Sequence, residues 1–148
     1  MGSYIYSEAK GEVKLKEENK KMIKVFKKKL TLLKIVNTMK IYVEMDLVSE
    51  SQLDREQFDD VFCNMLNNTR PFFDILQEDG RVDIYQAFIA MAVFSDGHFD
   101  DKIKCIFCFF DLSGDGDLDR KELSVFVQSS IVGLCKMTGL PAPSVMGI

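Results

Sequence analysis

Apolar residues recur at helical spacing along the first third of the chain. Between residues 12 and 45 they follow one another at steps of mostly three and four, at Met22, Val25, Phe26, Leu30, Leu33, Val36 and Met39. Such steps place side chains on one face of a helix, and lysines fill many of the intervening positions. The segment is therefore predicted to be basic, amphipathic and helical, either as one long helix or as two helices that break near Leu30 and Thr31.

The same spacing continues in later segments, which predicts an all-α fold. The further predicted helices cover residues 54–66, 84–94, 101–110 and 120–137. Turn residues and a proline predict a loop at 67–71. Residues 1–11 are expected to form a flexible tail, and residues 138–148, which contain two prolines, an extended tail.

The segment between the last two predicted helices, residues 111–122, has the sequence Asp-Leu-Ser-Gly-Asp-Gly-Asp-Leu-Asp-Arg-Lys-Glu. Ca²⁺ is a hard cation that takes roughly six to eight oxygen ligands, and this segment supplies oxygens at alternate positions. Gly116 at the sixth position permits the sharp turn around an ion. Asp117 would contribute its backbone carbonyl, Asp119 a water-mediated contact and Glu122 a bidentate carboxylate. The predicted metal-binding residues are Asp111, Ser113, Asp115, Asp117, Asp119 and Glu122.

An earlier segment, residues 46–57, shares the frame of this loop but lacks its ligands. When it is aligned on Leu53 at the eighth position, Val48 occupies the third position and neutral Gln57 the twelfth. Loss of the twelfth carboxylate removes oxygen ligands and a negative charge. We expect no ion at this segment.

Residues 75–86 form a second incomplete copy of the loop. Gly80 keeps the turn position and Val82 the eighth position, whereas Gln86 stands at the twelfth. Two acidic residues remain in the segment, Asp79 and Asp83, which is too few oxygen ligands for tight binding. The sequence therefore predicts a degenerate internal repeat with one complete copy.

Residues 30–136 resemble the EF-hand superfamily, in the group that includes calcineurin B, the neuronal calcium sensors and calaxin. The resemblance rests on the loop at 111–122 and on the runs Val-Asp-Ile-Tyr-Gln-Ala-Phe-Ile-Ala-Met-Ala from Val82 and Ser-Asp-Gly-His-Phe-Asp-Asp-Lys-Ile-Lys from Ser95. The run Leu-Asp-Arg-Glu-Gln-Phe from Leu53 is most similar to calaxin and related ciliary dynein-arm docking proteins. The resemblance implies a degenerate EF-hand pair at 46–94 and one intact hand at 101–137.

The EF-hands of this superfamily pair through short strands in their loops. Hands one and two are expected to pair with each other, and the eleven residues after Met137 are too few for a fourth hand. Hand three then lacks a mate. Its apolar helices are expected to contact a second copy of the chain, a different protein or the basic N-terminal helix.

Charge is distributed unevenly along the chain. Residues 1–45 carry eleven Lys and five Glu, a net charge of +6, whereas the rest carries eight Lys or Arg and eighteen Asp or Glu, a net charge of −10. The basic segment either presents a solvated face or docks to an acidic filament, a tubulin-like surface or anionic lipid. Nucleic acid is not expected as a partner, because no aromatic residues alternate with the lysines.

Other chemistry is sparse in the sequence. No nucleophile–base pair, phosphate-binding glycine loop or zinc-ligand set is present, so the chain is not expected to be an enzyme. The four cysteines lie in apolar helical patterns and are predicted to be buried, reduced thiols. No signal peptide and no apolar run of about 18 residues is present, which predicts a cytoplasmic protein without a transmembrane segment.

The sequence thus predicts a Ca²⁺-binding interaction protein, either a sensor or a regulatory subunit. It has one functional ion-binding site, which Mg²⁺ could occupy at rest. The alternative is a constitutive structural adaptor in a ciliary, axonemal or cytoskeletal assembly, in which the ion only stabilises the fold. A simple Ca²⁺ buffer would be inefficient with one site in 148 residues.

Overall fold

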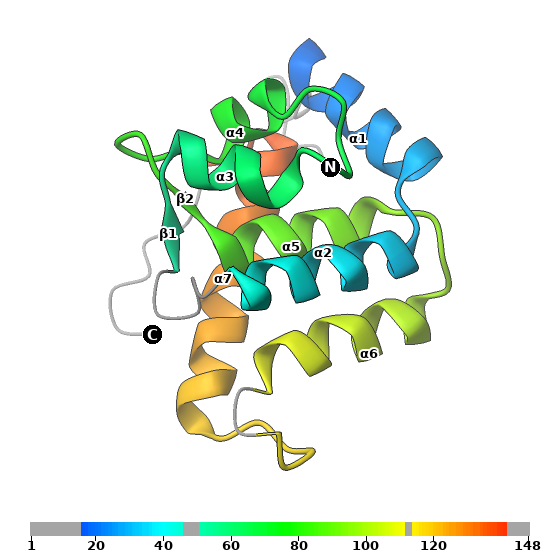
Figure 1. The fold of residues 1–148 in the computed structure, drawn as a ribbon, viewed down its shortest axis with the longest axis vertical. Coiled ribbons are helices and arrows are strands. Elements are labelled where there is room, and N and C mark those ends of the chain that lie inside the picture. Colours follow the sequence, from blue (N-terminus) through cyan, green and yellow to red (C-terminus); the bar gives the residue numbers. More distant parts are fainter. Residues whose placement is uncertain (1–15, 46–50, 112–113, 142–148) are drawn as a thin grey trace, which may run out of the picture.

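The computed structural model describes residues 16–45, 51–111 and 114–141, which are mainly helical (Figure 1). In chain order the elements are α1 (Glu17–Lys29), α2 (Leu32–Glu44), β1 (Gln52–Leu53), α3 (Arg55–Phe62), α4 (Arg70–Leu76), β2 (Val82–Asp83), α5 (Ile84–Phe94), α6 (Phe99–Phe110) and α7 (Arg120–Thr138). Each strand has only two residues, so the expected all-α class is confirmed for this part of the chain. The predicted tail at 1–11 lies outside the described residues, as do residues 142–148.

The basic N-terminal segment forms two helices rather than one. Leu30 ends α1 in an extended conformation, with φ −93° and ψ 131°. The Thr31 side chain then caps α2, because its hydroxyl accepts a hydrogen bond from the backbone N–H of Lys34 at 3.2 Å. Threonine is a favoured N-cap residue, since its oxygen satisfies an N–H group that the helix itself leaves unpaired. Of the two alternatives that the sequence left open, the structure therefore has two helices that break near Leu30 and Thr31.

Two predicted boundaries near the middle of the chain are wrong. The helix predicted for 54–66 ends at Phe62 and is followed by a turn, in which the N–H groups of Met65 and Leu66 both donate to the Phe62 carbonyl. The loop predicted for 67–71 ends earlier, since α4 begins at Arg70 and includes Pro71 in its first turn. Proline is well suited to a first helical turn, because its fixed φ is helical and its missing N–H is not needed there.

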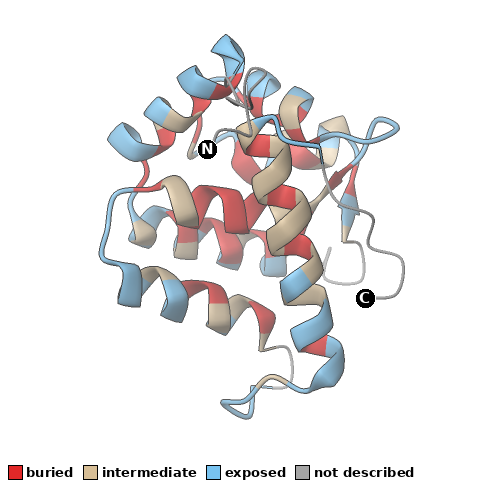
Figure 2. Cartoon of the chain, turned by 180° about the vertical axis from the view of Figure 1, so that it is seen from behind, coloured by how far each residue is buried: buried red, intermediate tan, exposed pale blue. Residues whose placement is uncertain are grey.

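Helix α5 is at the centre of the fold. Ile84 and nearly all residues from Ala87 onward are buried, so the helix is apolar on all sides. Such a helix is stable only when neighbours cover it all round. Helices α1, α2, α6 and α7 all contact it, and Figure 2 shows the buried positions concentrated in these central turns.

An aromatic cluster joins the N-terminal helices. The ring of Phe72 on α4 lies 4.9 Å from that of Phe26 on α1, edge to face. The same ring lies 5.6 Å from Phe58 and 6.0 Å from Phe62, both on α3. Each of these side chains is fully buried. Aromatic pairs in such arrangements contribute beyond their buried area, so this cluster fixes α1 to the body.

The two short strands pair antiparallel, with Leu53 opposite Val82 and Gln52 opposite Asp83. Leu53 and Val82 are the residues that the sequence alignment places at the eighth position of the first and second loops. Both side chains are fully buried. The expected pairing of these two loop segments is thus present.

The C-terminal helix α7 packs closely on α5, and Gly133 makes the close approach possible. A Cβ atom at Gly133 would lie 3.1 Å from the Gln86 carbonyl oxygen and 3.2 Å from the Gln86 Cα. Carbon atoms in contact prefer separations of roughly 3.5–4.0 Å. The absence of a side chain at this position therefore sets the distance between the two helices.

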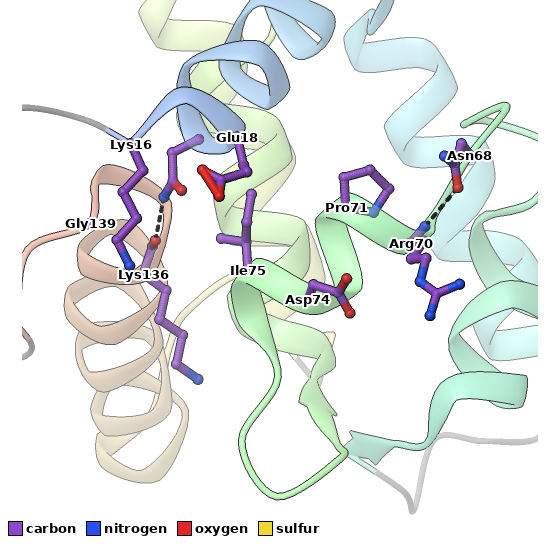
Figure 3. Close-up of a pocket in the computed structure, with 10 residues that line it drawn as sticks. Lys16, Glu18, Asn68, Arg70, Pro71, Asp74, Ile75, Lys136 and Gly139 are labelled. Carbon is purple, nitrogen blue, oxygen red and sulfur yellow. Dashed lines mark hydrogen bonds between the residues drawn. The ribbon is translucent and has the colours of Figure 1, made fainter.

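The C-terminal end of α7 is held by two polar side chains. Asn19 on α1 is 5% exposed, and its Nδ2 donates to the carbonyl oxygens of Lys136 at 3.0 Å and Met137 at 2.8 Å. The Lys136 ammonium donates to the Leu76 carbonyl at 2.9 Å and to Gln86 Oε1 at 2.8 Å. Figure 3 shows the start of α1 against the end of α7, beside a cavity of about 460 Å³. Of the three contacts expected for the helices at 101–137, the one with the basic N-terminal helix is therefore observed.

We expect replacement of Asn19 by Asp to destabilise the protein by about 2–3 kcal/mol at pH 7. The change removes both donated hydrogen bonds and places a buried carboxylate against two carbonyls at the negative end of a helix. Urea unfolding of the variant and the wild type measures the loss. Burial raises the pKa of the introduced carboxyl group in the folded protein, so the loss should shrink as the pH falls through that raised pKa, and it should be smallest below about pH 4, where the group is protonated in the unfolded chain as well.

Asn37, an exposed residue within α2, provides the control for this prediction. Its replacement by Asp makes the same chemical change without burying a charge, so we expect a loss within about 0.5 kcal/mol. An Asn19→Asp protein as stable as this control would show that the contact with α7 contributes nothing.

Candidate metal centre and the adjoining groove

The segment predicted to bind the ion connects α6 to α7 at one end of the molecule (Figure 1). Asp111 is the C-cap of α6 and Asp119 the N-cap of α7. Ser113, the third-position ligand in the prediction, lies outside the described residues, as does Leu112. The remaining five predicted ligands are all described.

The backbone of the loop is wound around the Asp111 carboxylate. Gly114 N–H donates to Asp111 Oδ1 at 3.0 Å, and Gly116 N–H donates to Oδ2 at 2.8 Å. Both glycines have positive φ, +71° and +88°, a conformation that costs glycine little and other residues much more. The turn that the sequence assigned to Gly116 is therefore present.

The next two acidic residues stay at the surface. Asp115 and Asp117 are both exposed, and the backbone N–H of Asp117 donates to Asp115 Oδ1 at 3.0 Å. This bond holds the Asp115 carboxylate within the turn. It fixes the backbone of the residue whose carbonyl is predicted to face the ion.

Glu122 is fixed in the first turn of α7 by a reciprocal capping box with Asp119. Asp119 Oδ1 accepts from Glu122 N–H at 2.8 Å, and Glu122 Oε1 accepts from Asp119 N–H at 3.0 Å. Glu122 is only 5% exposed although it is charged. The capping box satisfies N–H groups that the helix start leaves without partners, and it keeps the twelfth-position carboxylate beside the loop.

The side chains of the loop are chemically suited to a hard cation, but the oxygens of its described residues do not converge on a common metal position. Carboxylate and carbonyl oxygens are the donors that Ca²⁺ and Mg²⁺ prefer. Within the described ranges, no three acidic, histidine or cysteine side chains converge as metal ligands. Several of the loop oxygens instead accept backbone N–H groups, as described above. Binding of an ion would require a shift of these carboxylates, and the set of ligands stays a prediction.

The first incomplete loop has the same helix start as the complete one. Asp54 Oδ1 accepts from Gln57 N–H at 2.9 Å, and Gln57 Oε1 accepts from Asp54 N–H at 2.9 Å. Asp54 and Gln57 occupy the ninth and twelfth positions, as Asp119 and Glu122 do. The two segments therefore share a capping geometry and differ in charge at the twelfth position.

The second incomplete loop is tighter than its alignment suggests. Glu78 and Arg81 pair across a two-residue turn, with N–H to carbonyl distances of 2.8 and 3.1 Å. Asp79 and Gly80, between them, both have positive φ, which is the geometry of a tight hairpin turn. Asp83 caps α5 by accepting from Tyr85 N–H at 2.8 Å, and burial raises its pKa above the ordinary value.

A long apolar groove lies between α2 and α6 and was not found from the sequence. Its volume is about 930 Å³, and Asp111 is one of its lining residues. On α2, Leu33 is 70% and Val43 54% exposed, which is unusual for large apolar side chains. The spacing of apolar residues along α2 did not separate Leu33 and Val43 from the buried stripe of that helix. The apolar lining residues are Leu32, Leu33, Val36, Met39, Tyr42, Val43, Tyr85, Cys105, Cys108 and Phe109.

The prediction that all four cysteines are buried is wrong. All are free thiols, but Cys63 and Cys108 are exposed, Cys135 is intermediate, and only Cys105 is buried. On α6 the buried face is set by Cys105, Ile106 and Phe110. Cys108 lies three residues from Cys105, and both line the groove, but only the Cys108 side chain is exposed there. Sequence periodicity alone did not distinguish this position from the core. Burial, together with the neighbouring Cys108 thiolate, raises the pKa of Cys105 to about 11.

We expect a thiol reagent at pH 8 to modify Cys108 at least about 100-fold faster than Cys105, because the thiolate is the reactive form. Since the pKa of Cys105 is about 11, its rate should rise about tenfold per pH unit until that value is approached. Mass spectrometry of the modified peptides measures both rates. Equal rates for Cys105 and Cys108 at pH 8 would contradict the assigned burial, and Cys63 provides an exposed reference outside the groove.

No helix among the described residues combines the length and the apolar character that crossing a membrane requires. Comparison of the chain with protein-family models, with curated proteins and with solved structures found no match.

Proposed function

We propose that the chain is an EF-hand protein that binds Ca²⁺ at residues 111–122 and uses the ion to alter the groove between α2 and α6. The observation that carries the proposal is the winding of the loop around Asp111, whose two carboxylate oxygens accept the N–H groups of Gly114 and Gly116. A backbone wound in this way holds the first-position carboxylate at the centre of the loop. A cation that entered there would meet that carboxylate first.

The internal repeat supports the same proposal. Leu53 and Val82, at the eighth position of two loops, are direct strand partners. The first and third loops start their outgoing helices with the same capping box. A chain in which three loops follow one frame is typical of helix–loop–helix repeats of about 30–40 residues.

Electrostatics favours a divalent cation at this loop. Asp111, Asp115, Asp117, Asp119 and Glu122 carry five negative charges, and Arg120 and Lys121 two positive ones, a net charge of −3 within one loop. Like charges at this density repel each other, and a bound cation removes the repulsion. The oxygens suit Ca²⁺ better than Mg²⁺ if the loop supplies most of the shell, since Mg²⁺ retains several waters.

The loop has a direct structural route to the groove. Asp111 is both the first loop residue and part of the groove lining. The next residue back, Phe110 on α6, lies 5.3 Å from Phe126 on α7, edge to face. Phe109 lies 4.7 Å from Phe88 and 6.2 Å from Tyr42 on α2. A change in the angle between α6 and α7 would therefore disturb the packing that forms one wall of the groove.

A structural adaptor is the second candidate function, and the fixed end of α7 favours it. Asn19 and Lys136 hold that end to α1, α4 and α5, and a capping box fixes Glu122 at the start of α7. In this alternative the ion stabilises hand three and leaves the groove unchanged.

Two measurements test the proposal. Isothermal titration with Ca²⁺ and, separately, Mg²⁺ should show one binding site, and no heat of binding with either ion would exclude the proposal. The modification rate of Cys108, which lines the groove, then separates the candidates. A rate that changes with Ca²⁺ supports the responsive protein, whereas Ca²⁺ binding with an unchanged rate and a higher melting temperature supports the adaptor.

A further inference from the structure

We infer that the outer face of α1 is a docking surface for an extended, acidic polypeptide segment. This inference goes beyond the proposed Ca²⁺ function and does not depend on it. The surface, here the lysine face, comprises Lys20, Lys21, Lys24, Lys27 and Lys28, all of which are exposed.

The lysine face lies directly opposite the buried side of α1. Asn19, Met22 and Phe26 are buried against the body, and a helix of 3.6 residues per turn places the five lysines on the far side. Figure 2 shows α1 at the edge of the molecule, with buried positions on its inner side. The helix has 13 residues, so the face is about 20 Å long and one helix wide.

The lysines repel one another, and only those nearest the start of α1 have acidic neighbours in the sequence. Lys24 has a lysine three or four residues away in both directions, at 20, 21, 27 and 28. Like-charge pairs at these spacings destabilise a helix. Glu17 pairs with Lys20 at 3.8 Å in the first turn, but eight lysines and no acidic residue lie between Glu18 and Glu44. A negatively charged partner would turn this repulsion into attraction.

The geometry fits an extended acidic chain. Lys20, Lys24 and Lys28 form a row along the helix with steps of about 6 Å. Side chains on one face of an extended polypeptide are separated by about 6.6 Å, twice the rise per residue. A segment with an acidic residue at every second position therefore matches the row closely over these three lysines.

Two other polyanions fit the surface less well. A membrane is a wide plane, and it would bring anionic lipid close to a body whose residues 46–148 carry a net charge of −10. Nucleic acid is bound most effectively by arginine forks and by exposed aromatic rings. The lysine face contains neither, and the aromatic residue of α1, Phe26, is fully buried. A narrow polypeptide can contact α1 without approaching the acidic body, and each of its carboxylates can pair with one lysine ammonium group.

The test is fluorescence anisotropy with a labelled peptide of about 12 residues in which Glu alternates with Ser. We expect binding by the wild type at about 50 mM salt that weakens strongly at about 500 mM. Lys24→Glu should weaken binding at least about tenfold. Lys104→Glu, at an exposed position on α6, is the matched control, because both changes take the net charge from −4 to −6, and we expect less than a twofold effect.

Stability measurements exclude unfolding as the cause. Lys24→Glu replaces four repulsive pairs with attractive ones, so its melting temperature should equal or exceed that of the wild type. The inference is overturned if the wild type does not bind the peptide, or if Lys104→Glu weakens binding as much as Lys24→Glu. Binding to anionic vesicles or duplex DNA but not to the peptide also overturns it. Peptide binding that persists in the presence of a Ca²⁺ chelator would show that the lysine face acts independently of Ca²⁺ binding at residues 111–122.

Discussion

Replacement of Glu122 by Gln is expected to weaken Ca²⁺ binding at least about 100-fold, equivalent to about 2.7 kcal/mol. The change removes one negative charge and one of the two carboxylate oxygens from the twelfth position of the loop. It should leave the start of α7 folded, because a glutamine oxygen can still accept the Asp119 N–H. Isothermal titration of the variant and the wild type measures the change in affinity.

The first loop of the same chain shows why the fold should tolerate this change. There, Gln57 forms a capping box with Asp54 at 2.9 Å in each direction. Glu56→Gln, at an exposed residue in the first turn of α3, makes the same change in charge outside the loop. We expect no more than a twofold effect on Ca²⁺ affinity from it. Unchanged binding in Glu122→Gln would remove this residue from the ligand set.

Local features of the fold could be predicted from the sequence because they depend on neighbouring residues. The break between α1 and α2 follows from Thr31, whose hydroxyl caps the second helix. The pairing of Leu53 with Val82 follows from a loop frame that keeps one apolar residue at a fixed position. In the segment 111–122, Gly116 indicated a turn, and the turn is present with positive φ.

Features that depend on the packing of distant segments could not be predicted. The contact between Asn19 and the end of α7 joins residues more than one hundred positions apart, and no local pattern marks it. The groove depends on how far apart α2 and α6 lie, so Cys108 and Val43 could not be assigned to surface or core by their spacing. The length of the turn in the second incomplete loop was misjudged for another reason. Asp79 adopts a positive φ, which makes the turn tighter than the alignment suggests.

Replacement of Gly133 by Leu is expected to destabilise the protein by about 3 kcal/mol, since overpacking of a close contact forces the backbone to move. The first carbon of the new side chain would lie 3.1 Å from the Gln86 carbonyl oxygen, an atom of the central helix that cannot rotate away. The melting temperature should fall by about 10 °C for a chain of this size. Thermal unfolding followed by circular dichroism measures the effect.

Two further variants identify the close helix contact as the cause. Ser124→Leu adds the same side chain at an exposed position of α7, and we expect a change within about 0.5 kcal/mol. Gly133→Ala should lie near the wild type, because alanine favours a helix by about 1 kcal/mol while its Cβ needs a shift of only a few tenths of an ångström. The alanine variant should therefore be more stable than the leucine variant, because the contact tolerates a small displacement of the helices but not a large one. A Gly133→Leu protein with the melting temperature of the wild type would show that the packing of α7 on α5 does not depend on this close approach.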